Sequence, residues 1–502
     1  MKTTLRFLCG FVALLAIARA ADAPRPTHAP VLLPVASDPT VSFRIWFKVG
    51  AQDDPAGKEG LASLTAAMLT EAATRRNSYE RILDQLFPLA SSYRASASME
   101  MTVIHGRTHR DNLAEFYPLL LDAIREPAFK QADLDRLKSR TLNTLENTLR
   151  FASDEELGKA VLYNEIFAGT PYGHLPLGTI DAVKSITLDD IKNFYAAHFT
   201  RDNVVVGLGG GFEPALVQRL ENDLAQLPAG TPPPVAAPHP QPLGGVRVTL
   251  VEKNAASTAI SFGFPIDVHR GEKDWYALAI ANSWLGEHRN SSSHLYQVIR
   301  EARGLNYGDY SYIENFPNGG RLTMPPQNVS RRQQIFEIWI RPVPNAARHF
   351  ALRAALREFQ QLVDHGMTAE QFELTRKFLK KYVLHYAPTT TERLGYALDD
   401  VFYCLDESHL ARFSRMMDTM TLDDVNAAIK RHWQTGRAQI AIVTEGAAAF
   451  ADALANETPS PIIYDSPKPA SVLEEDKAIA TFPLKIKREN IRLVPVADLF
   501  TK

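Results

Sequence analysis

The chain has 502 residues, of which 45% are apolar and 22% are charged, and this apolar content excludes an intrinsically disordered protein. Its 55 Lys and Arg residues against 57 Asp and Glu residues give a formal net charge of -2. No basic excess is therefore available to neutralise phosphates, which excludes nucleic acid as the main partner. A single core stops growing near about 250–300 residues, so at least two domains are expected.

Residues 1–20 have the pattern of a secretory signal peptide. Lys2 and Arg6 precede an apolar stretch, and residues 18–20 supply the small side chains of a cleavage site. The apolar stretch is shorter than the roughly 20 residues that a spanning helix needs, and no later segment is a better candidate, so no membrane span is expected. We predict a periplasmic or secreted protein that is cleaved near Ala20.

A proline-rich segment, residues 226–246, divides the chain. It contains seven prolines, which exclude a helix or a central strand and favour an extended, semi-rigid linker. The flanking segments, residues 21–225 and 247–450, both mix strand-like runs with helical periodicity, which predicts an α+β fold for each. Residues 451–502 form a C-terminal extension, and its last apolar residues alternate with polar ones as in a half-buried strand.

The two flanks carry an internal repeat. The segment 187–191, Thr-Leu-Asp-Asp-Ile, is followed six residues later by His198-Phe199. The segment 421–425, Thr-Leu-Asp-Asp-Val, is followed at the same spacing by His432-Trp433. Helix capping explains the Thr and Asp residues but not the His-aromatic pair, so we predict two diverged copies of one domain. The recurring histidines are expected to pack at helix ends.

Several segments resemble the pitrilysin/insulinase family of zinc peptidases, the inverzincins. They are Gly60-Leu61-Ala62, Pro127-Ala-Phe129, Thr170-Pro-Tyr-Gly173 and the run from Arg300 to Tyr307, Arg-Glu-Ala-Arg-Gly-Leu-Asn-Tyr. The resemblance implies two homologous α+β domains, each an antiparallel-rich sheet packed with helices. It also implies that the domains are joined by the proline-rich linker and enclose a chamber.

The family binds zinc through a His-x-x-Glu-His motif on one helix. At the matching positions this chain has Ser63, Ala66 and Ala67, and the third ligand position falls near Thr144, two residues before Glu146. A hydroxyl and two methyl groups are not a zinc site. We therefore predict no metal, no cofactor and no catalytic residue in this chain.

The family resemblance also implies that an Arg and a Tyr, seven residues apart, bind the substrate backbone and stabilise the oxyanion. Arg300 and Tyr307 have this spacing. The local pattern predicts a helix over 294–302, a turn at Gly304 and a strand over 305–313. Arg300 and Tyr307 are therefore the predicted substrate-binding residues.

Three functions remain open. The chain resembles the non-catalytic subunit of heterodimeric family members, which implies pairing with a homologous subunit that carries the zinc. Such a pair would hydrolyse peptides or unfolded polypeptides bound as an added strand at a sheet edge. The alternatives are a peptide-binding or assembly protein without peptidase activity, and an enzyme whose chemistry has moved elsewhere.

Overall fold

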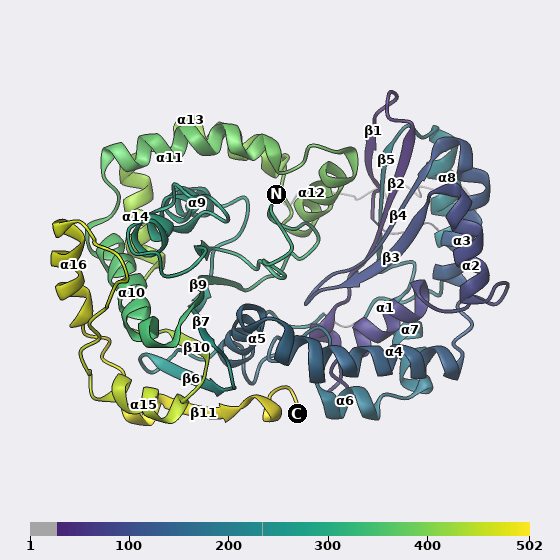
Figure 1. Cartoon of the computed structure of the whole chain (residues 1–502). Helices are drawn as coiled ribbons and strands as arrows, with labels where there is room; N and C mark the ends of the chain where they lie inside the picture. The colour runs from purple at the N-terminus through teal and green to yellow at the C-terminus, as the bar shows by residue number, and fades with distance from the viewer. Residues whose placement is uncertain (1–27, 233) are drawn as a thin grey trace, which may run out of the picture.

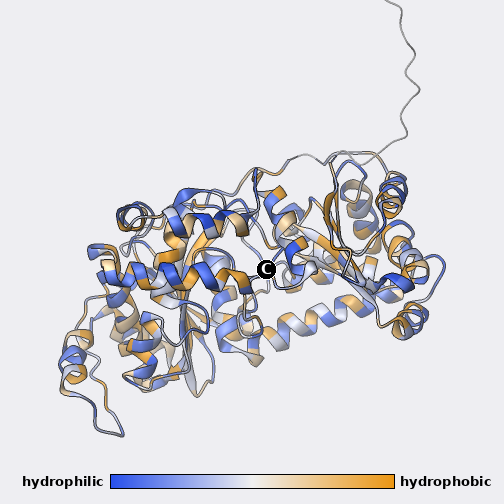
Figure 2. Ribbon diagram, turned by 90° about the horizontal axis from the view of Figure 1, so that it is seen from above, coloured by the Kyte–Doolittle hydropathy of each residue, from blue (hydrophilic) through white to orange (hydrophobic). Residues whose placement is uncertain are grey.

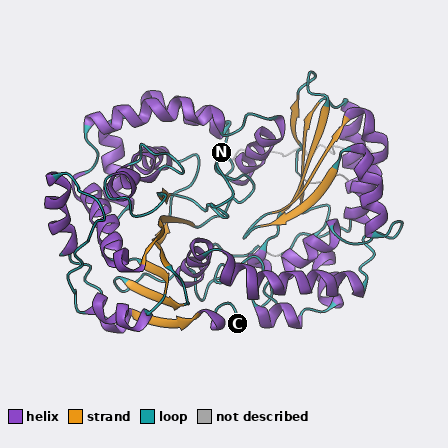
Figure 3. Cartoon of the chain, viewed as in Figure 1, coloured by secondary structure: helices purple, strands orange, loops and turns teal. Residues whose placement is uncertain are grey.

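The computed structural model describes residues 28–232 and 234–502, so the predicted signal peptide lies outside the described residues. Two separate β-sheets dominate the described chain, and helices flank each of them (Figures 1 and 3). The polypeptide between α8 and β6, apart from residue 233, forms neither helix nor strand, as its prolines predict.

The first sheet has the strand order β1-β5-β2-β4-β3, and only the β1–β5 pair is parallel. Its strands are β1 (Val31–Pro34), β2 (Thr40–Phe47), β3 (Ser92–Ala97), β4 (Thr102–His109) and β5 (Val204–Gly210). Seven helices share a hydrophobic core with this sheet. They are α1 (Leu61–Thr70), α2 (Tyr79–Leu86), α3 (Leu113–Arg125), α4 (Gln131–Asn143), α6 (Ile180–Ser185), α7 (Leu188–His198) and α8 (Pro214–Leu224).

The second sheet has the order β11-β6-β10-β7-β9-β8. Its strands are β6 (Arg247–Glu252), β7 (Ser257–Ile266), β8 (Asp309–Tyr312), β9 (Gln334–Pro344), β10 (Gln439–Thr444) and β11 (Ile491–Pro495). Without β11, the positions of its five strands repeat those of the first sheet. The predicted duplication of an α+β domain is therefore confirmed by topology.

Seven helices surround the second sheet. They are α9 (Lys273–Gly286), α10 (Arg348–His365), α11 (Ala369–Tyr382), α13 (His409–Thr419), α14 (Leu422–His432), α15 (Ala447–Ala455) and α16 (Ala470–Ala480). Figure 2 shows hydrophilic and hydrophobic residues alternating along the outer helices, as amphipathic packing requires. Over the described ranges, no helix combines the length and apolar character needed to cross a membrane.

The sequence repeat corresponds to helix α7 with strand β5 and to helix α14 with strand β10. Both helices begin with a reciprocal cap, formed by Thr187 with Asp190 in α7 and by Thr421 with Asp424 in α14. Each cap satisfies backbone N–H groups that the first helical turn leaves without a partner. Capping therefore accounts for the Thr and Asp residues of the repeat, as predicted.

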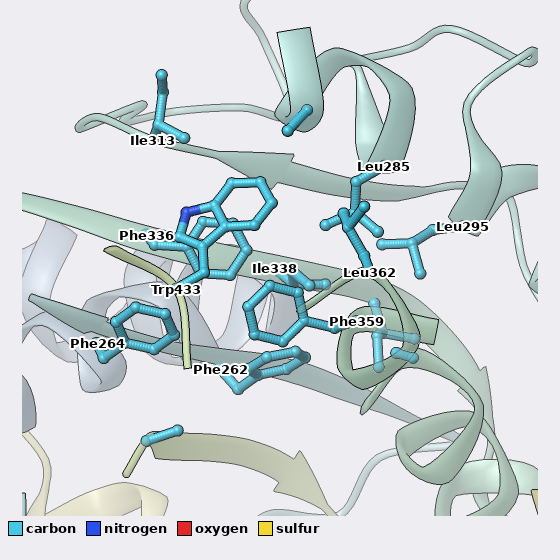
Figure 4. Close-up of a cluster of buried hydrophobic side chains, with 14 of the residues drawn as sticks. Phe262, Phe264, Leu285, Leu295, Ile313, Phe336, Ile338, Phe359, Leu362 and Trp433 are labelled. Carbon is cyan, nitrogen blue, oxygen red and sulfur yellow. The ribbon is translucent and has the colours of Figure 1, made fainter. Parts of the chain in front are cut away.

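The aromatic residue that ends each repeat enters a core. The Phe199 ring lies 4.7 Å from the ring of Phe47 on β2. In the second half, the Trp433 ring lies 4.6 Å from Phe336 on β9, which in turn stacks on Phe359 of α10 at 4.8 Å (Figure 4). These aromatic pairs fix the end of α7 and α14 against their sheets.

Each half covers the sheet of the other half with one helix. Helix α5 (Asp154–Ile166) belongs to the first half, yet its Leu157 and Val161 pack with Val251 and Val443 of the second sheet. Helix α12 (Thr390–Phe402) packs Leu394 and Leu398 against Trp46 and Val205 of the first sheet (Figure 1). The two halves therefore share their cores.

The C-terminal extension joins both halves. Strand β11 pairs in parallel with β6, so the predicted strand is present. Ile491 is buried as expected, but Leu493 is exposed. The chain then returns to the first half, where Leu499 and Phe500 are buried beside α5. The Ile180 backbone N–H, at the start of α6, donates to the Phe500 carbonyl (2.8 Å), and Arg150 donates to the Leu499 carbonyl.

Candidate functional site

Helix α1 carries the three positions where the resemblance places a zinc motif. The Ser63 hydroxyl donates to the Pro176 carbonyl, and Ala66 is buried. The carboxylate of Glu146, near the third ligand position, pairs instead with Lys184 (3.2 Å). Within residues 28–232 and 234–502, no cluster of three His, Cys, Asp or Glu residues could hold a metal ion. This donor set does not fit zinc.

A cavity of about 430 Å³ lies where the two halves meet. Ser63 of α1, Ala97 of β3 and Tyr163 of α5 line it from the first half, and Arg331 lines it from the loop before β9. Of the three motif positions on α1, Ser63 lines this cavity.

A network of charged hydrogen bonds fixes the halves beside the cavity. Arg332 donates to the Glu100 carboxylate from its Nε (2.6 Å) and from its backbone N–H (2.7 Å). The Tyr172 hydroxyl donates to the same carboxylate, and Arg332 Nη2 donates to the Gln52 side chain (3.0 Å). Hydrogen bonds to a buried, charged carboxylate of this kind hold both sides of the cavity in one arrangement.

A serine–histidine pair lies at the edge of the cavity. Ser96, which lines the cavity, is 2.9 Å from His105 Nε2, and His105 Nδ1 is 3.0 Å from the Arg44 guanidinium. Burial, then the charge of Arg44, lowers the pKa of His105 to about 3. Since Arg44 can only donate, Nδ1 is an acceptor and Nε2 carries the proton. His105 therefore donates to Ser96 and cannot act as its base, which argues against relocated serine chemistry.

Arg300 lies in a π-helical turn, Tyr296–Glu301, between α9 and β8. Its side chain is 36% exposed, and its guanidinium lies 3.4 Å from Glu301 and 5.9 Å from the centre of the Tyr296 ring. Its Nε has no hydrogen-bond partner within the described chain. Arg300 is thus held loosely by its own chain.

Tyr307 is 78% exposed and precedes strand β8, which begins at Asp309. The prediction of a strand from 305 to 313 was therefore too long. The Asn306 side chain accepts from the Gly308 N–H (3.2 Å) and donates to Asp309 (2.8 Å), which makes a turn where the strand was expected. In the described structure, no hydrogen bond or ring contact joins Tyr307 to Arg300.

Two residues between Arg300 and Tyr307, namely Arg303 and Asn306, are buried and hydrogen-bonded. Arg303 is 3% exposed and donates to Asp476 (2.8 Å) and Glu475 (2.8 Å) of α16. Asn306 is 7% exposed and bonds Asp309 and the Arg341 carbonyl. The segment is therefore anchored through Arg303 and Asn306, while Tyr307 is exposed and Arg300 is partly exposed, with its Nε buried and without a partner among the described residues.

Glu287, which directly follows α9, gives a prediction about how the stability of the folded chain depends on pH. Burial raises the pKa of its carboxyl from 4.5 to about 7. The unfolded chain loses this proton at lower pH than the folded chain does, so stability falls as the pH rises from about 4.5 to about 7. Between pH 5 and pH 8, the wild-type protein is expected to lose roughly 2–3 kcal/mol more than Glu287→Gln.

Chemical denaturation at the two pH values measures this difference. The neighbouring His288, whose pKa burial lowers to about 4, is present in both proteins and cancels in the comparison. Glu301→Gln removes a more exposed carboxyl of the same segment and serves as the control. Equal pH slopes for Glu287→Gln and the wild type would contradict the assignment.

Two family models match this chain. One, described as insulinase (peptidase family M16), matches residues 31–174, and the other, the peptidase M16 inactive domain, matches residues 185–379. Together they span about two thirds of the chain.

The chain belongs to the M16 peptidase family. The inactive-domain match contains Arg300 and Tyr307, and the insulinase match contains α1 with its three substituted positions. The family prediction made from the sequence is therefore confirmed.

Its M16 relatives are distant in sequence. An uncharacterized zinc protease of Streptomyces coelicolor is 23% identical, and the alignment covers 66% of this chain and 69% of that protein. The "Non-peptidase homolog YmxG" of Helicobacter pylori is 24% identical, over 79% of this chain and 87% of its own length. Relatives described as a protease and as a non-peptidase thus both align with this chain.

Solved M16 structures share the fold. A peptidase M16 inactive domain from Pseudomonas fluorescens superimposes with a TM-score of 0.72 and 21% identity, covering 82% of this chain and 94% of that chain. A protease from Helicobacter pylori gives a TM-score of 0.69 at 16% identity, covering 84% of this chain and 100% of that chain. These likenesses confirm the architecture.

The sequence of this M16 protein gave no signal for several residues around the cavity. Glu100 and Arg332 are 232 positions apart, and Tyr163 and Arg331 are also distant in the chain. No motif links them, because the packing of the two halves brings them together.

Proposed function

We propose that this chain is the non-catalytic subunit of a heterodimeric M16 peptidase and binds the peptide substrate through Arg300 and Tyr307. One observation carries the proposal. In a segment whose Arg303 and Asn306 are buried and bonded, Tyr307 is exposed, Arg300 is partly exposed, and the side chains of both lack a hydrogen-bond partner in the described chain. Exposed residues of this chemistry, at this spacing, are suited to bind a group outside the chain.

The two side chains supply the donors that peptide hydrolysis requires. A guanidinium presents several N–H groups in a planar fork, and a phenol presents one O–H. Both can donate to a substrate carbonyl and to the oxyanion that forms from it. Arg300 and Tyr307 would therefore orient the peptide and stabilise developing negative charge.

The metal chemistry is assigned to the partner. Ser63, Ala66 and Ala67 cannot replace two histidines and a glutamate, so this chain is proposed to hold no zinc and no catalytic residue. The partner is a homologous zinc-bearing subunit. Residues 1–20 support export, so the pair is proposed to act in the periplasm or outside the cell on peptides or unfolded polypeptides.

Peptidase activity on a mixed peptide library tests this function. The chain alone is expected to be inactive, and a mixture with a co-encoded homologue that has an intact His-x-x-Glu-His motif is expected to be active. A chelator should abolish that activity, and elemental analysis should find zinc only in the partner. Activity of the purified chain alone, or one zinc held tightly by it, would contradict the proposal.

The alternative is a peptide-binding or assembly protein without peptidase activity. The cavity between the halves favours it, because a binding site within this chain needs no partner. It predicts peptide binding that a chelator does not change and no activity in any mixture.

A further inference from the structure

Arg331 is a buried cation that forms no ion pair within the described residues. It is 2% exposed and lines the cavity between the halves. Its guanidinium lies over the rings of Tyr163 (5.0 Å), Phe167 (5.4 Å) and Tyr172 (5.8 Å). Its Nε donates to the Gln334 side chain (3.3 Å), but its Nη2 has no hydrogen-bond partner within the described residues.

The adjacent residue shows the usual arrangement for a cation at this position. Arg332 is paired with Glu100 at 2.6 Å, whereas no carboxylate of the described chain lies within 4.0 Å of Arg331. An arginine cannot lose its proton in a protein, so burial cannot neutralise it. An unpaired buried charge is costly unless a counter-ion reaches it.

The nearby acidic groups have other partners. Glu337 accepts from the Tyr163 hydroxyl (2.8 Å) and from Trp339 Nε1 (2.9 Å). Glu156 lines the cavity, accepts from the Gly320 N–H (3.0 Å) and lies 3.6 Å from Lys159. The charges of Lys159 and Arg331 both act on the buried Glu337 carboxylate. Neither Glu156 nor Glu337 forms an ion pair with Arg331, so within the described residues no carboxylate contacts its guanidinium.

The free edge of β3 limits what can enter the cavity. The Ala95 backbone N–H points away from β4 and donates to the Thr70 hydroxyl of α1 (3.0 Å). Thr70 thus closes the edge at Ala95, and by strand alternation the backbone groups of Ala97 point to the same outer side. Ala97 lines the cavity, so the edge is open there for the end of a chain but closed to a long strand.

We propose that this cavity binds the carboxylate end of a short peptide, with Arg331 as the counter-ion. The cavity volume lies within the range of small-ligand sites, and much of its wall is apolar, including Met99, Leu149 and Val329. The carboxylate is either the C-terminus or a terminal acidic side chain. This site is separate from Arg300 and Tyr307 and needs no partner subunit.

Equilibrium binding to the purified chain tests the site. The probe is a pool of acetylated pentapeptides, randomised at the last three positions and fluorescently labelled, made as free acids and as C-terminal amides. A third pool is amidated and ends in Glu. The free acids are expected to bind at least tenfold more tightly than the randomised amides, and binding of the Glu-ended amides would identify an acidic side chain as an accepted source. Equal binding of acids and randomised amides, or no binding, would overturn the proposal.

Three variants separate a carboxylate site from a general loss of structure. Arg331→Met removes the cation, and Ala160→Phe fills the cavity from α5 while leaving Arg331 in place. Both are expected to weaken free-acid binding at least tenfold. Arg321→Met removes an exposed arginine that is not part of the cavity wall and should bind as the wild type does. Unchanged binding by a folded Ala160→Phe protein would place the peptide elsewhere.

Discussion

Replacing Arg300 with alanine is expected to lower kcat/KM of the assembled peptidase by about a hundredfold, because loss of one oxyanion donor typically costs about that much. The side chain is 36% exposed and its Nε has no hydrogen-bond partner within the described residues, so its loss should not unfold the chain. Subunit association should also persist. Steady-state kinetics of the mixed complex, with association followed by size-exclusion chromatography, measure both effects.

A matched variant distinguishes a specific role from loss of positive charge. Arg437→Ala removes an exposed arginine between α14 and β10 and is expected to leave the kinetics unchanged. Tyr307→Phe keeps the ring and removes the hydroxyl, so it should lower kcat in the same direction as Arg300→Ala. If Arg300→Ala retains full activity in an intact complex, Arg300 has no part in the mechanism.

Removing residues 499–502 is expected to destabilise the folded chain by about 4 kcal/mol. Leu499 and Phe500 are 7% and 6% exposed, and burying such a side chain contributes about 1.5–3 kcal/mol. The truncation also removes the carbonyl that accepts from the buried Arg150. Thermal denaturation should show a lower melting temperature for the truncated protein.

The control for this truncation is removal of Lys502 alone, which is exposed. That shorter deletion is expected to leave the melting temperature unchanged. An equal melting temperature after loss of residues 499–502 would show that these residues do not stabilise the contact between the halves.

The features that could be predicted from the sequence are those that short sequence patterns specify, such as helix starts and the internal repeat. Thr187 and Thr421 start equivalent helices, and the repeat they belong to predicted two copies of one α+β domain, which the strand orders of the two sheets confirm. The run from Arg300 to Tyr307 was recognised from its spacing, although Asn306 and the turn it forms shortened the strand expected there. A hydrogen-bonded turn of this kind competes with strand pairing and is not visible in the hydrophobic pattern.

The cavity could not be predicted, because its walls are assembled from distant segments. Nothing in the sequence indicates that α5 and α12 each cover the sheet of the other half. The sequence likewise does not distinguish Arg331 from a surface arginine. Only the folded structure brings its guanidinium over the rings of Tyr163, Phe167 and Tyr172.

The reciprocal covering of the sheets has a consequence for the order of events during synthesis. The first sheet is complete once β5 has been made, but Trp46 and Val205 wait for α12, which begins at Thr390. At ribosomal rates of about 5–20 residues per second, the roughly 180 intervening residues take on the order of 10–40 seconds. During that interval the nascent chain presents an uncovered apolar surface. When the chain is made in the cytosol without residues 1–20, chaperone binding to the ribosome-bound chain is therefore expected to last until α12 has emerged.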